Sequence, residues 1–407
     1  MTMSAAVTGP AVASELVDVL DGIGLPTKRD EAWRYAPHRE LAQLTFGPTA
    51  GGSTVSADDL DAMIPELDGP RVVVVNGVVD HERSTLSASR EQLHLSGVEV
   101  FTRTVDRSDE RVADAFAALN LAYAADAVVI DVAAGESLDV PIHVIDVAVP
   151  GEATNTSCSS VIIRVGAGGS AVVVESRVGI GTAFGGSNVH TSVVLGDDAT
   201  LEHVLIQDLP REQVHLSRVE VTQGARSTLR TRSFNLGASY GRLAYEIRLA
   251  GAAAIAELSG LFFGAGEQIL DQQITVVHEA KDCTSRQSFR GVLDDAGTGV
   301  FNGGVDVCPG ADGTDAEQSN DNLLLSNRAE VNTQPRLEIL ADEVACKHGA
   351  TVGQLDDTAL YYLRSRGINA DEARRLLING FADQIVDDVG VEAVRNWITH
   401  RLGHDRD

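Results

Sequence analysis

The segment Val189–Gly224 reads VHTSVVLGDDATLEHVLIQDLPREQVHLSRVEVTQG. Apolar and polar residues alternate in three runs, which end at Gly-Asp-Asp, Asp-Leu-Pro-Arg and Gln-Gly in turn. Alternation with a period of two indicates strands that bury one face, and the separating residues are typical of turns. The same pattern continues on both sides, from Ala127 to about Ala350. We therefore expect a central region of short β-strands.

The turn glycines of this region recur at a nearly fixed interval. Gly168, Gly196, Gly224 and Gly251 are 28, 28 and 27 residues apart, and a second set of turns lies midway between them. A fixed period with two strands per unit is typical of a β-solenoid, in which each coil buries its inward residues against its neighbours. An antiparallel meander of evenly long strands has the same periodicity, so the pattern alone leaves both architectures open.

Composition excludes some classes of protein. The chain has 407 residues, with 32 Lys and Arg against 59 Asp and Glu, and a net charge of −27. Such an acidic chain repels phosphate backbones, so we expect no nucleic-acid partner. Because no apolar run reaches the roughly 20 residues that span a bilayer, and the first residues lack a basic signal-peptide start, we expect a cytoplasmic protein without a membrane segment. Aromatic residues are only 4%, which suits a narrow core of small side chains.

The flanking regions follow a different pattern. Residues 1–126 form an N-terminal mixed, mostly helical region, in which we expect a helix capped by Ser14, a hairpin at Asn76-Gly77 and a helix from about Ser108 to Ala125. Residues 127–353 form the β core. The helical period returns in residues 354–407, where Asp356 and Asn369 are capping residues. About three helices are expected there, as a cap on the β region or as a docking module.

The cysteines do not form a metal motif by themselves. No Cys-x-x-Cys pair occurs, so the spacing supports neither a structural zinc site nor a cysteine-only iron–sulfur site. Cys346 and His348, however, would point to the same side of a strand, about 7 Å apart. Both side chains can bind transition metals, and Lys347 would favour the thiolate if its ammonium lay near the sulfur. The pair is either half of a shared metal site or a core cysteine with a hydrogen-bonded histidine.

Two acidic stretches are candidate chemical sites. Asp294-Asp295 could be the carboxylate pair of a glycan-cleaving β-helix, but the neighbouring Gly297 and Gly299 favour a turn. The carboxylates of the second stretch lack the spacing of a calcium loop; they are Asp312, Asp315, Glu317 and Asp321. Without a P-loop, a nucleophile elbow or a nucleotide-binding glycine fingerprint, the chain is expected to be a scaffold or a general interaction module rather than an enzyme.

The residues that begin at Cys346 resemble a known family. The run CKHGATVGQLD at Cys346–Asp356, followed by LYYLRSRGI at Leu360–Ile368, resembles the C-terminal signature of the SufB/SufD family of the SUF iron–sulfur cluster assembly machinery. Shorter stretches are similar to the same family: DEAWRY at 30–35, TDAEQ at 314–318, NLLLS at 322–326 and PRLEI at 335–339. Gly349 after His348, and Asn320 where SufB carries a cysteine, resemble the SufD branch.

This resemblance implies a mainly β fold: a right-handed parallel β-helix (β-solenoid) core with N-terminal α/β and C-terminal α-helical flanking regions. It implies a non-catalytic scaffold subunit that forms a heterodimer with a SufB paralogue, with a homodimer allowed when the chain is isolated. His348, with Cys346 beside it, would lie at the SufB interface as a metal ligand shared with the partner chain. An iron–sulfur cluster would be transient there and not held stably by this chain alone.

The resemblance also implies that the C-terminal helices bind the SufC ABC-type ATPase. The residues expected to do so are Leu360, Tyr361, Arg364, Arg366, Gly367, Leu376 and Phe381. Two alternatives remain at this point: a SufB-type scaffold that holds the cluster itself, and a carbohydrate-active β-helix protein.

Overall fold

The computed structural model of the chain describes residues 24–47, 55–85, 92–95, 97–104, 114–151 and 155–404. The helix expected at Ser14 lies outside these residues, as does the first part of the helix expected from Ser108. The β region is built from β5 (Asp126–Val132), β6 (Ile142–Ala148), β7 (Thr156–Val165), β8 (Ser170–Gly179), β9 (Gly185–Leu195), β10 (Thr200–Asp208), β11 (Gln213–Gln223), β12 (Thr228–Asn235), β13 (Tyr240–Leu249), β14 (Ile255–Gly264), β15 (Ile269–His278), β16 (Thr284–Leu293), β17 (Thr298–Val307), β18 (Asp315–Leu324), β19 (Glu330–Ile339) and β20 (Ala345–Gly353).

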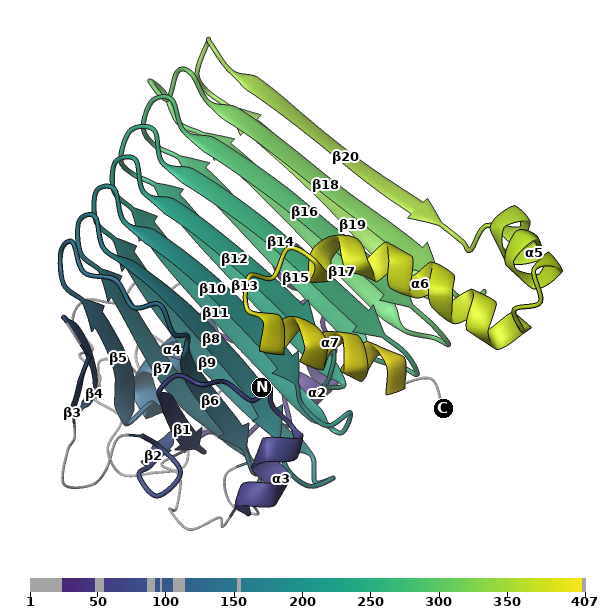
Figure 1. Cartoon of the computed structure of the whole chain (residues 1–407), viewed down its shortest axis with the longest axis horizontal. Helices are drawn as coiled ribbons and strands as arrows, with labels where there is room; N and C mark the ends of the chain where they lie inside the picture. Colours follow the sequence, from purple (N-terminus) through teal and green to yellow (C-terminus); the bar gives the residue numbers. More distant parts are fainter. Residues whose placement is uncertain are drawn as a thin grey trace.

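These strands form two sheets that face each other (Figure 1). Consecutive strands alternate between the sheets, so β6, β8 and the later even-numbered strands form one sheet and the odd-numbered strands from β5 form the other. Each strand pairs in parallel with the strand two places further along the chain. Parallel pairing needs a crossover between neighbours, which here is the strand of the opposite sheet. The β-solenoid is therefore confirmed, and the antiparallel meander is excluded.

The strand register shows why the repeat is regular at first and less regular later. Thr200 pairs with Thr228, and Thr228 pairs with Ile255, so the step from coil to coil equals the spacing of the turn glycines. The steps become longer in the later coils, where the successive partners are Thr284, Asp315 and Ala345. The longer turns of the last coils explain why the glycine rhythm is not visible beyond Gly251.

Glycine occurs at these turns for two different structural reasons. A Cβ on Gly196 would lie 2.7 Å from the backbone nitrogen of Ala167 in the preceding coil, so close packing of coils excludes a side chain there. Gly168 instead has a φ of +67°, and Asp198, one coil further on, has a φ of +59° at the same turn position. A left-handed residue at each of these turns is therefore a repeating feature of the coil.

The core between the sheets is made of inward-pointing aliphatic side chains. It runs from Ile142 and Val173 in the early coils to Phe289 and Phe301 in the later ones. It also holds charge: the Arg177 guanidinium and the Glu175 carboxylate form a fully buried ion pair. Burial favours a neutral Glu175, but Arg177 and the hydrogen bond from His203 outweigh this and lower the pKa of Glu175 to about 2.

The N-terminal region extends both sheets, and its helix α4 (Ala115–Tyr123) covers the odd-numbered one. Its helices are η2 (Glu31–Trp33), α2 (His38–Leu41), α3 (Ala57–Ala62) and α4, and its strands are β1 (Arg71–Val75), β2 (Val78–Asp80), β3 (Gln92–Leu95) and β4 (Val98–Thr104). The hairpin expected at Asn76-Gly77 joins β1 to β2. Because β1 pairs with β6 and β4 with β5, the two sheets continue into the region before residue 127.

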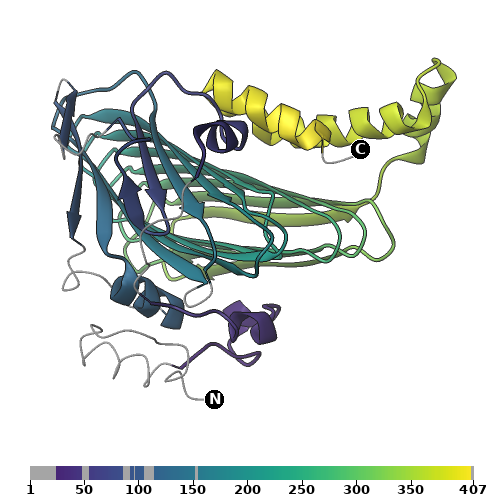
Figure 2. The ribbon, with the colours of Figure 1, turned by 90° about the horizontal axis from the view of Figure 1, so that it is seen from below.

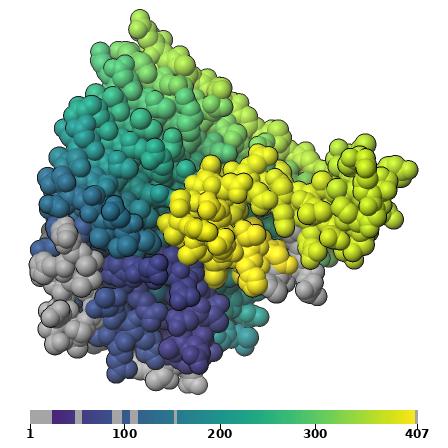
Figure 3. Space-filling view, viewed as in Figure 1, coloured from purple at the N-terminus to yellow at the C-terminus, as the bar shows by residue number. Residues whose placement is uncertain are grey.

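Three C-terminal helices follow β20, as expected: α5 (Asp357–Ser365), α6 (Ala370–Val386) and α7 (Glu392–His404). Asp356 caps α5, and Asn369 caps α6 by accepting the backbone N–H of Glu372. The half of α6 that follows Ile378, together with α7, packs on the outer face of the even-numbered sheet, whereas α5 stands away from the solenoid (Figures 2 and 3). In the described part of the chain, no helix is long and apolar enough to cross a bilayer.

Candidate functional site

The last coil of the solenoid ends in two unpaired strand edges. β19 pairs only with β17 and β20 only with β18, and within the described residues no strand lies beyond either of them (Figure 1). Such edges offer a row of backbone N–H and C=O groups for pairing with another chain. Prominent exposed apolar side chains accompany them, with Leu340 60% and Val352 52% exposed. The end of the solenoid is therefore an open surface.

Cys346 and His348 lie on β20 at this open end. The parallel register aligns Cys346 with Ala316 and His348 with Gln318 on β18, and both of these residues are buried and inward-facing. Because side chains alternate along a strand, Cys346 and His348 share the inward side. They lie at the mouth of the core, where no further coil from the described ranges covers them. The side chain of His348 is exposed, and that of Cys346 is half-buried.

The surroundings of Cys346 favour the thiol over the thiolate. The side chain packs in a small apolar cluster with Val305 and Ala316, and burial raises its pKa above the usual value. The ammonium of Lys347 lies 2.9 Å from the Glu317 carboxylate on β18. The condition under which Lys347 would favour a thiolate at Cys346, an ammonium near the sulfur, is therefore not met, because alternation along the strand directs Lys347 to the outer face and Glu317 binds it there.

The inward face beneath His348 is polar but incomplete as a metal site. Gln318 donates a hydrogen bond from Nε2 to Oε1 of Gln287 at 2.8 Å, and its own Oε1 is buried without a partner. No group of three or more His, Cys, Asp or Glu side chains that could hold a metal occurs among the described residues. Cys346 and His348 are thus two potential donors at an open surface, and any further ligand would have to come from another molecule.

The remaining cysteines are distributed along the solenoid. Cys158 is buried beneath α4, where its Sγ lies 3.8 Å from the carbonyl oxygen of Leu119, and burial raises its pKa strongly. Cys283 is buried at a turn within the core, and Cys308 is half-buried at a later turn. Burial also raises the pKa of both. All four are free cysteines.

The expected ATPase-binding residues fall into two groups. Tyr361 is 76% exposed and Leu376 48% exposed. Arg364, Arg366 and Gly367 are also exposed, and Gly367 ends α5 with a φ of +91°. Leu360 is half-buried.

Phe381 differs from these residues because it packs on the solenoid. Its ring lies 4.6 Å from the Arg290 guanidinium of β16, and its carbonyl oxygen accepts a hydrogen bond from that side chain. Phe381 therefore helps to hold α6 on the solenoid.

Residues of the two acidic stretches form a turn and ion pairs. Asp294-Asp295 form the turn between β16 and β17, and Asp295 has a φ of +51°. On β18, Asp315 pairs with Arg286, and Glu317 pairs with Lys347. The turn expected at Asp294-Asp295 is observed.

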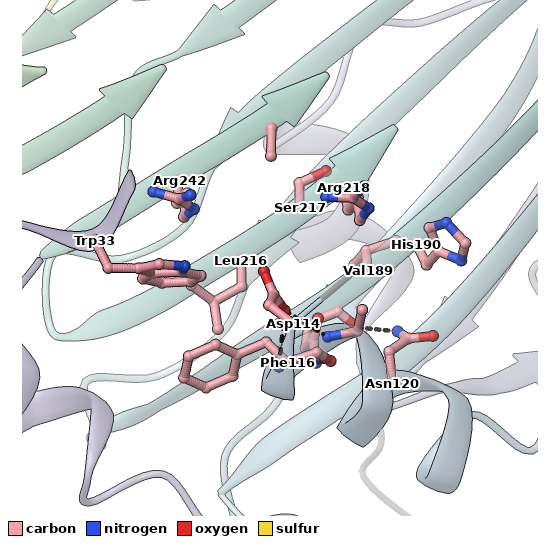
Figure 4. A pocket seen from close by; sticks show the side chains of 13 residues that line it. Trp33, Asp114, Phe116, Asn120, Val189, His190, Leu216, Ser217, Arg218 and Arg242 are labelled. Atoms are coloured by element: carbon pink, nitrogen blue, oxygen red, sulfur yellow. Dashed lines mark hydrogen bonds between the residues drawn. The ribbon is translucent and has the colours of Figure 1, made fainter. Parts of the chain in front are cut away.

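A small pocket between α4 and the odd-numbered sheet is lined by Trp33, the tryptophan of the DEAWRY motif (Figure 4). Trp33 inserts between α4 and the outer face of the odd-numbered sheet, and the Arg242 guanidinium stacks on its ring at 3.8 Å. Arg242 also donates to the carbonyl oxygen of Ala32 at 2.8 Å and to the carboxylate of Asp271 at 2.6 Å. The motif thus fastens the N-terminal segment to the solenoid. No local pattern in the sequence indicates Arg242, because Trp33 is distant along the chain and only the fold brings the two together.

Comparison with known proteins agrees with this architecture. A family described as SUF system FeS cluster assembly, SufBD core domain, matches residues 148–381. The iron–sulfur cluster assembly protein SufD of Escherichia coli (strain K12) is 30% identical over 93% of this chain and 89% of its own length. An iron–sulfur cluster assembly SufBD family protein of Mycobacterium leprae (strain TN) is 32% identical over 95% and 92%, respectively. The chain therefore belongs to the SufBD family of the SUF system for iron–sulfur cluster assembly, within which it fits SufD.

Proposed function

We propose that this chain is a non-catalytic scaffold subunit of the SUF machinery, which works in the cytoplasm and pairs with a SufB-type paralogue through the open end of its solenoid. The observation that carries the proposal is that this end combines two unpaired strand edges with two inward-facing donors. A partner that covered the edges would also cover Cys346 and His348. The two side chains would then lie inside an interface rather than in solvent.

His348 is the stronger candidate ligand of the two. A neutral imidazole binds iron without first losing a proton, whereas a thiol must ionise. The raised pKa of Cys346 makes that ionisation unfavourable in the isolated chain. An iron–sulfur cluster is then a cargo that forms between the two chains and is passed on, with the paralogue supplying the ligands that this chain lacks.

The C-terminal helices are proposed to bind a SufC-type ATPase. α5 buries none of its side chains, and Tyr361 and Tyr362 are 76% and 56% exposed. Exposed aromatic and arginine side chains are enriched at the centres of protein interfaces. Because α6 and α7 are fixed to the solenoid, a partner bound to α5 could transmit movement along α6 toward the coils that carry the open end.

The His348→Ala variant tests the proposal in the assembled complex. The chain would be co-expressed with the ATPase and the cysteine-bearing paralogue, and the cluster formed on the purified complex would be measured by its visible absorbance and iron content. We expect an intact complex with at least a several-fold lower cluster yield. The matched control is His400→Ala, which removes an exposed histidine of α7. A normal cluster yield in the His348→Ala complex would contradict the role given to His348.

The isolated chain provides a second comparison. Reconstitution with iron and sulfide should leave it without a stable cluster, because among the described residues only two donors meet at the open end. A stable cluster on the isolated chain would favour the alternative of a SufB-type, cluster-holding scaffold.

A further inference from the structure

A cleft separates the first turns of α6 from the turn between β16 and β17. It encloses about 490 Å³. Its apolar lining comes from Phe263 at the end of β14, Leu325 after β18, and Ile378 of α6, of which Phe263 and Ile378 are largely buried. Beyond Ile378, α6 packs on the sheet. The cleft thus lies beside the part of α6 that precedes Ile378. Figure 2 shows that the start of α6 leads away from the solenoid to α5.

Carboxylates dominate the rim of this cleft. Four line it, Asp294 and Asp295 from the solenoid turn and Asp371 and Glu372 from the first turn of α6, against the two guanidinium groups of Arg374 and Arg375. The balance of these charges is 2 − 4 = −2. Arg374 is already engaged, because it donates to the carbonyl oxygen of Leu325 at 2.9 Å and lies 3.5 Å from the Asp294 carboxylate.

We propose that this cleft receives a segment of the ATPase that carries an apolar side chain next to a lysine or arginine. The inference rests on the proposed function, because it extends the docking surface of α5 and α6 onto the solenoid itself. The apolar lining suits the first side chain, and the negative rim suits the second. Arg375 of its wall and the next residue, Leu376, are both exposed on α6.

Charge neutralisation tests the proposal without disturbing the bond that Arg374 makes to the solenoid. The variant is Asp295→Asn with Asp371→Asn in the full chain, because asparagine also tolerates the left-handed conformation of residue 295. The dissociation constant for the purified ATPase would be measured by calorimetry at about 0.05 M and about 0.5 M salt. We expect binding about tenfold weaker at the lower salt, with a smaller difference at the higher.

Two further variants distinguish complementarity from general damage. Arg375→Gln removes a positive charge from the wall, so it should strengthen binding about threefold, which a merely disruptive change would not do. Asp387→Asn with Asp388→Asn neutralises two exposed carboxylates at the other end of α6 and should leave the dissociation constant within about twofold.

A failure of this inference and a failure of the proposed ATPase-docking function give different results. If the unaltered chain does not bind the ATPase at all, the proposed docking function is wrong. If the unaltered chain binds, but Asp295→Asn with Asp371→Asn binds equally well and Arg375→Gln binds no tighter, the cleft is not part of the interface and the inference is overturned.

Discussion

Cys346 and His348 are close neighbours on one strand, but their side chains have different surroundings. Strand alternation is enough to predict that both point the same way, and β20 shows this. The environment of each could not be derived from the sequence. It depends on Val305 and Ala316, which reach Cys346 from other strands, and on the absence of a covering coil over His348 within the described residues. The position of the Lys347 ammonium could not be derived for the same reason, because the carboxylate that binds it belongs to the neighbouring strand β18.

The thiol of Cys346 should react slowly with iodoacetamide near neutral pH. Burial raises the pKa of Cys346, so only a small fraction of the side chain is thiolate near neutral pH. The alkylation rate should therefore continue to increase at pH values at which an ordinary cysteine is already ionised. Alkylation can be followed by mass spectrometry of the peptide that contains Cys346. Lys347→Met should leave this rate unchanged, because Glu317 already binds the ammonium. A marked slowing in that variant would show that Lys347 activates the thiol after all.

Buried histidines should make the fold sensitive to mild acid. Burial, assisted by Arg71 for His143 and by Arg177 for His215, lowers the pKa of each imidazole to about 3. Unfolded histidines bind protons below a pH of about 6.5. Protons therefore favour the unfolded chain between these values, and the free energy of unfolding should fall by roughly 1.4 kcal/mol per histidine for each pH unit below 6.5.

Urea unfolding at pH 7 and pH 5 measures this dependence. The His143→Gln, His215→Gln variant should be less stable at pH 7, because it disturbs the hydrogen bonds to Ser176 and Ser187, but its stability should change less between the two pH values. If the free energy of unfolding of the variant falls as much between pH 7 and pH 5 as that of the unaltered chain, the acid sensitivity comes from other groups.

At the scale of elements, the repeat is the feature that the sequence predicted best. The two-residue alternation and the spacing from Gly168 to Gly251 indicated coils of two strands, and local capping signals at Asp356 and Asn369 located α5 and α6. Local signals could not separate a parallel solenoid from a meander, because strand pairing is a property of the three-dimensional fold. Of the four strands before residue 105, the hairpin signal at Asn76-Gly77 indicated β1 and β2. The strands β3 and β4 were missed, since β4 is completed by pairing with β5.

Two glycine substitutions distinguish a glycine that close packing of coils requires from a glycine that only lowers the stability of a helix. Gly251→Ala should destabilise the chain by about 2–4 kcal/mol, because its Cβ would meet the backbone of Ala225 in the preceding coil. Gly380→Ala, in the interior of α6, has no atom within 4 Å of the new Cβ and should stabilise the chain by about 0.5–1 kcal/mol. Both are measured by urea unfolding. Equal effects at the two positions would remove packing as the reason for the turn glycine.

At the scale of the whole molecule, the two proposed contact surfaces lie on different elements, one on the last strands of the solenoid and one on the C-terminal helices. The open end presents β19 and β20, and the helical surface presents α5 with the beginning of α6 (Figure 1). A scaffold needs this separation, because two partners must bind at the same time. The charge of −27 is spread over the chain, and much of the positive charge is used in ion pairs between coils, such as Arg226 with Asp198 and Arg230 with Glu257.

Hydrogen exchange of the backbone amides tests the central claim most directly. The full chain would be measured alone, with the ATPase, and with the cysteine-bearing paralogue. We expect the paralogue to slow exchange in β19 and β20 while leaving α5 unchanged. We expect the ATPase to slow exchange in α5 and the beginning of α6 while leaving β20 unchanged. A stable complex with the paralogue in which β19 and β20 exchange as fast as in the free chain would contradict the central claim.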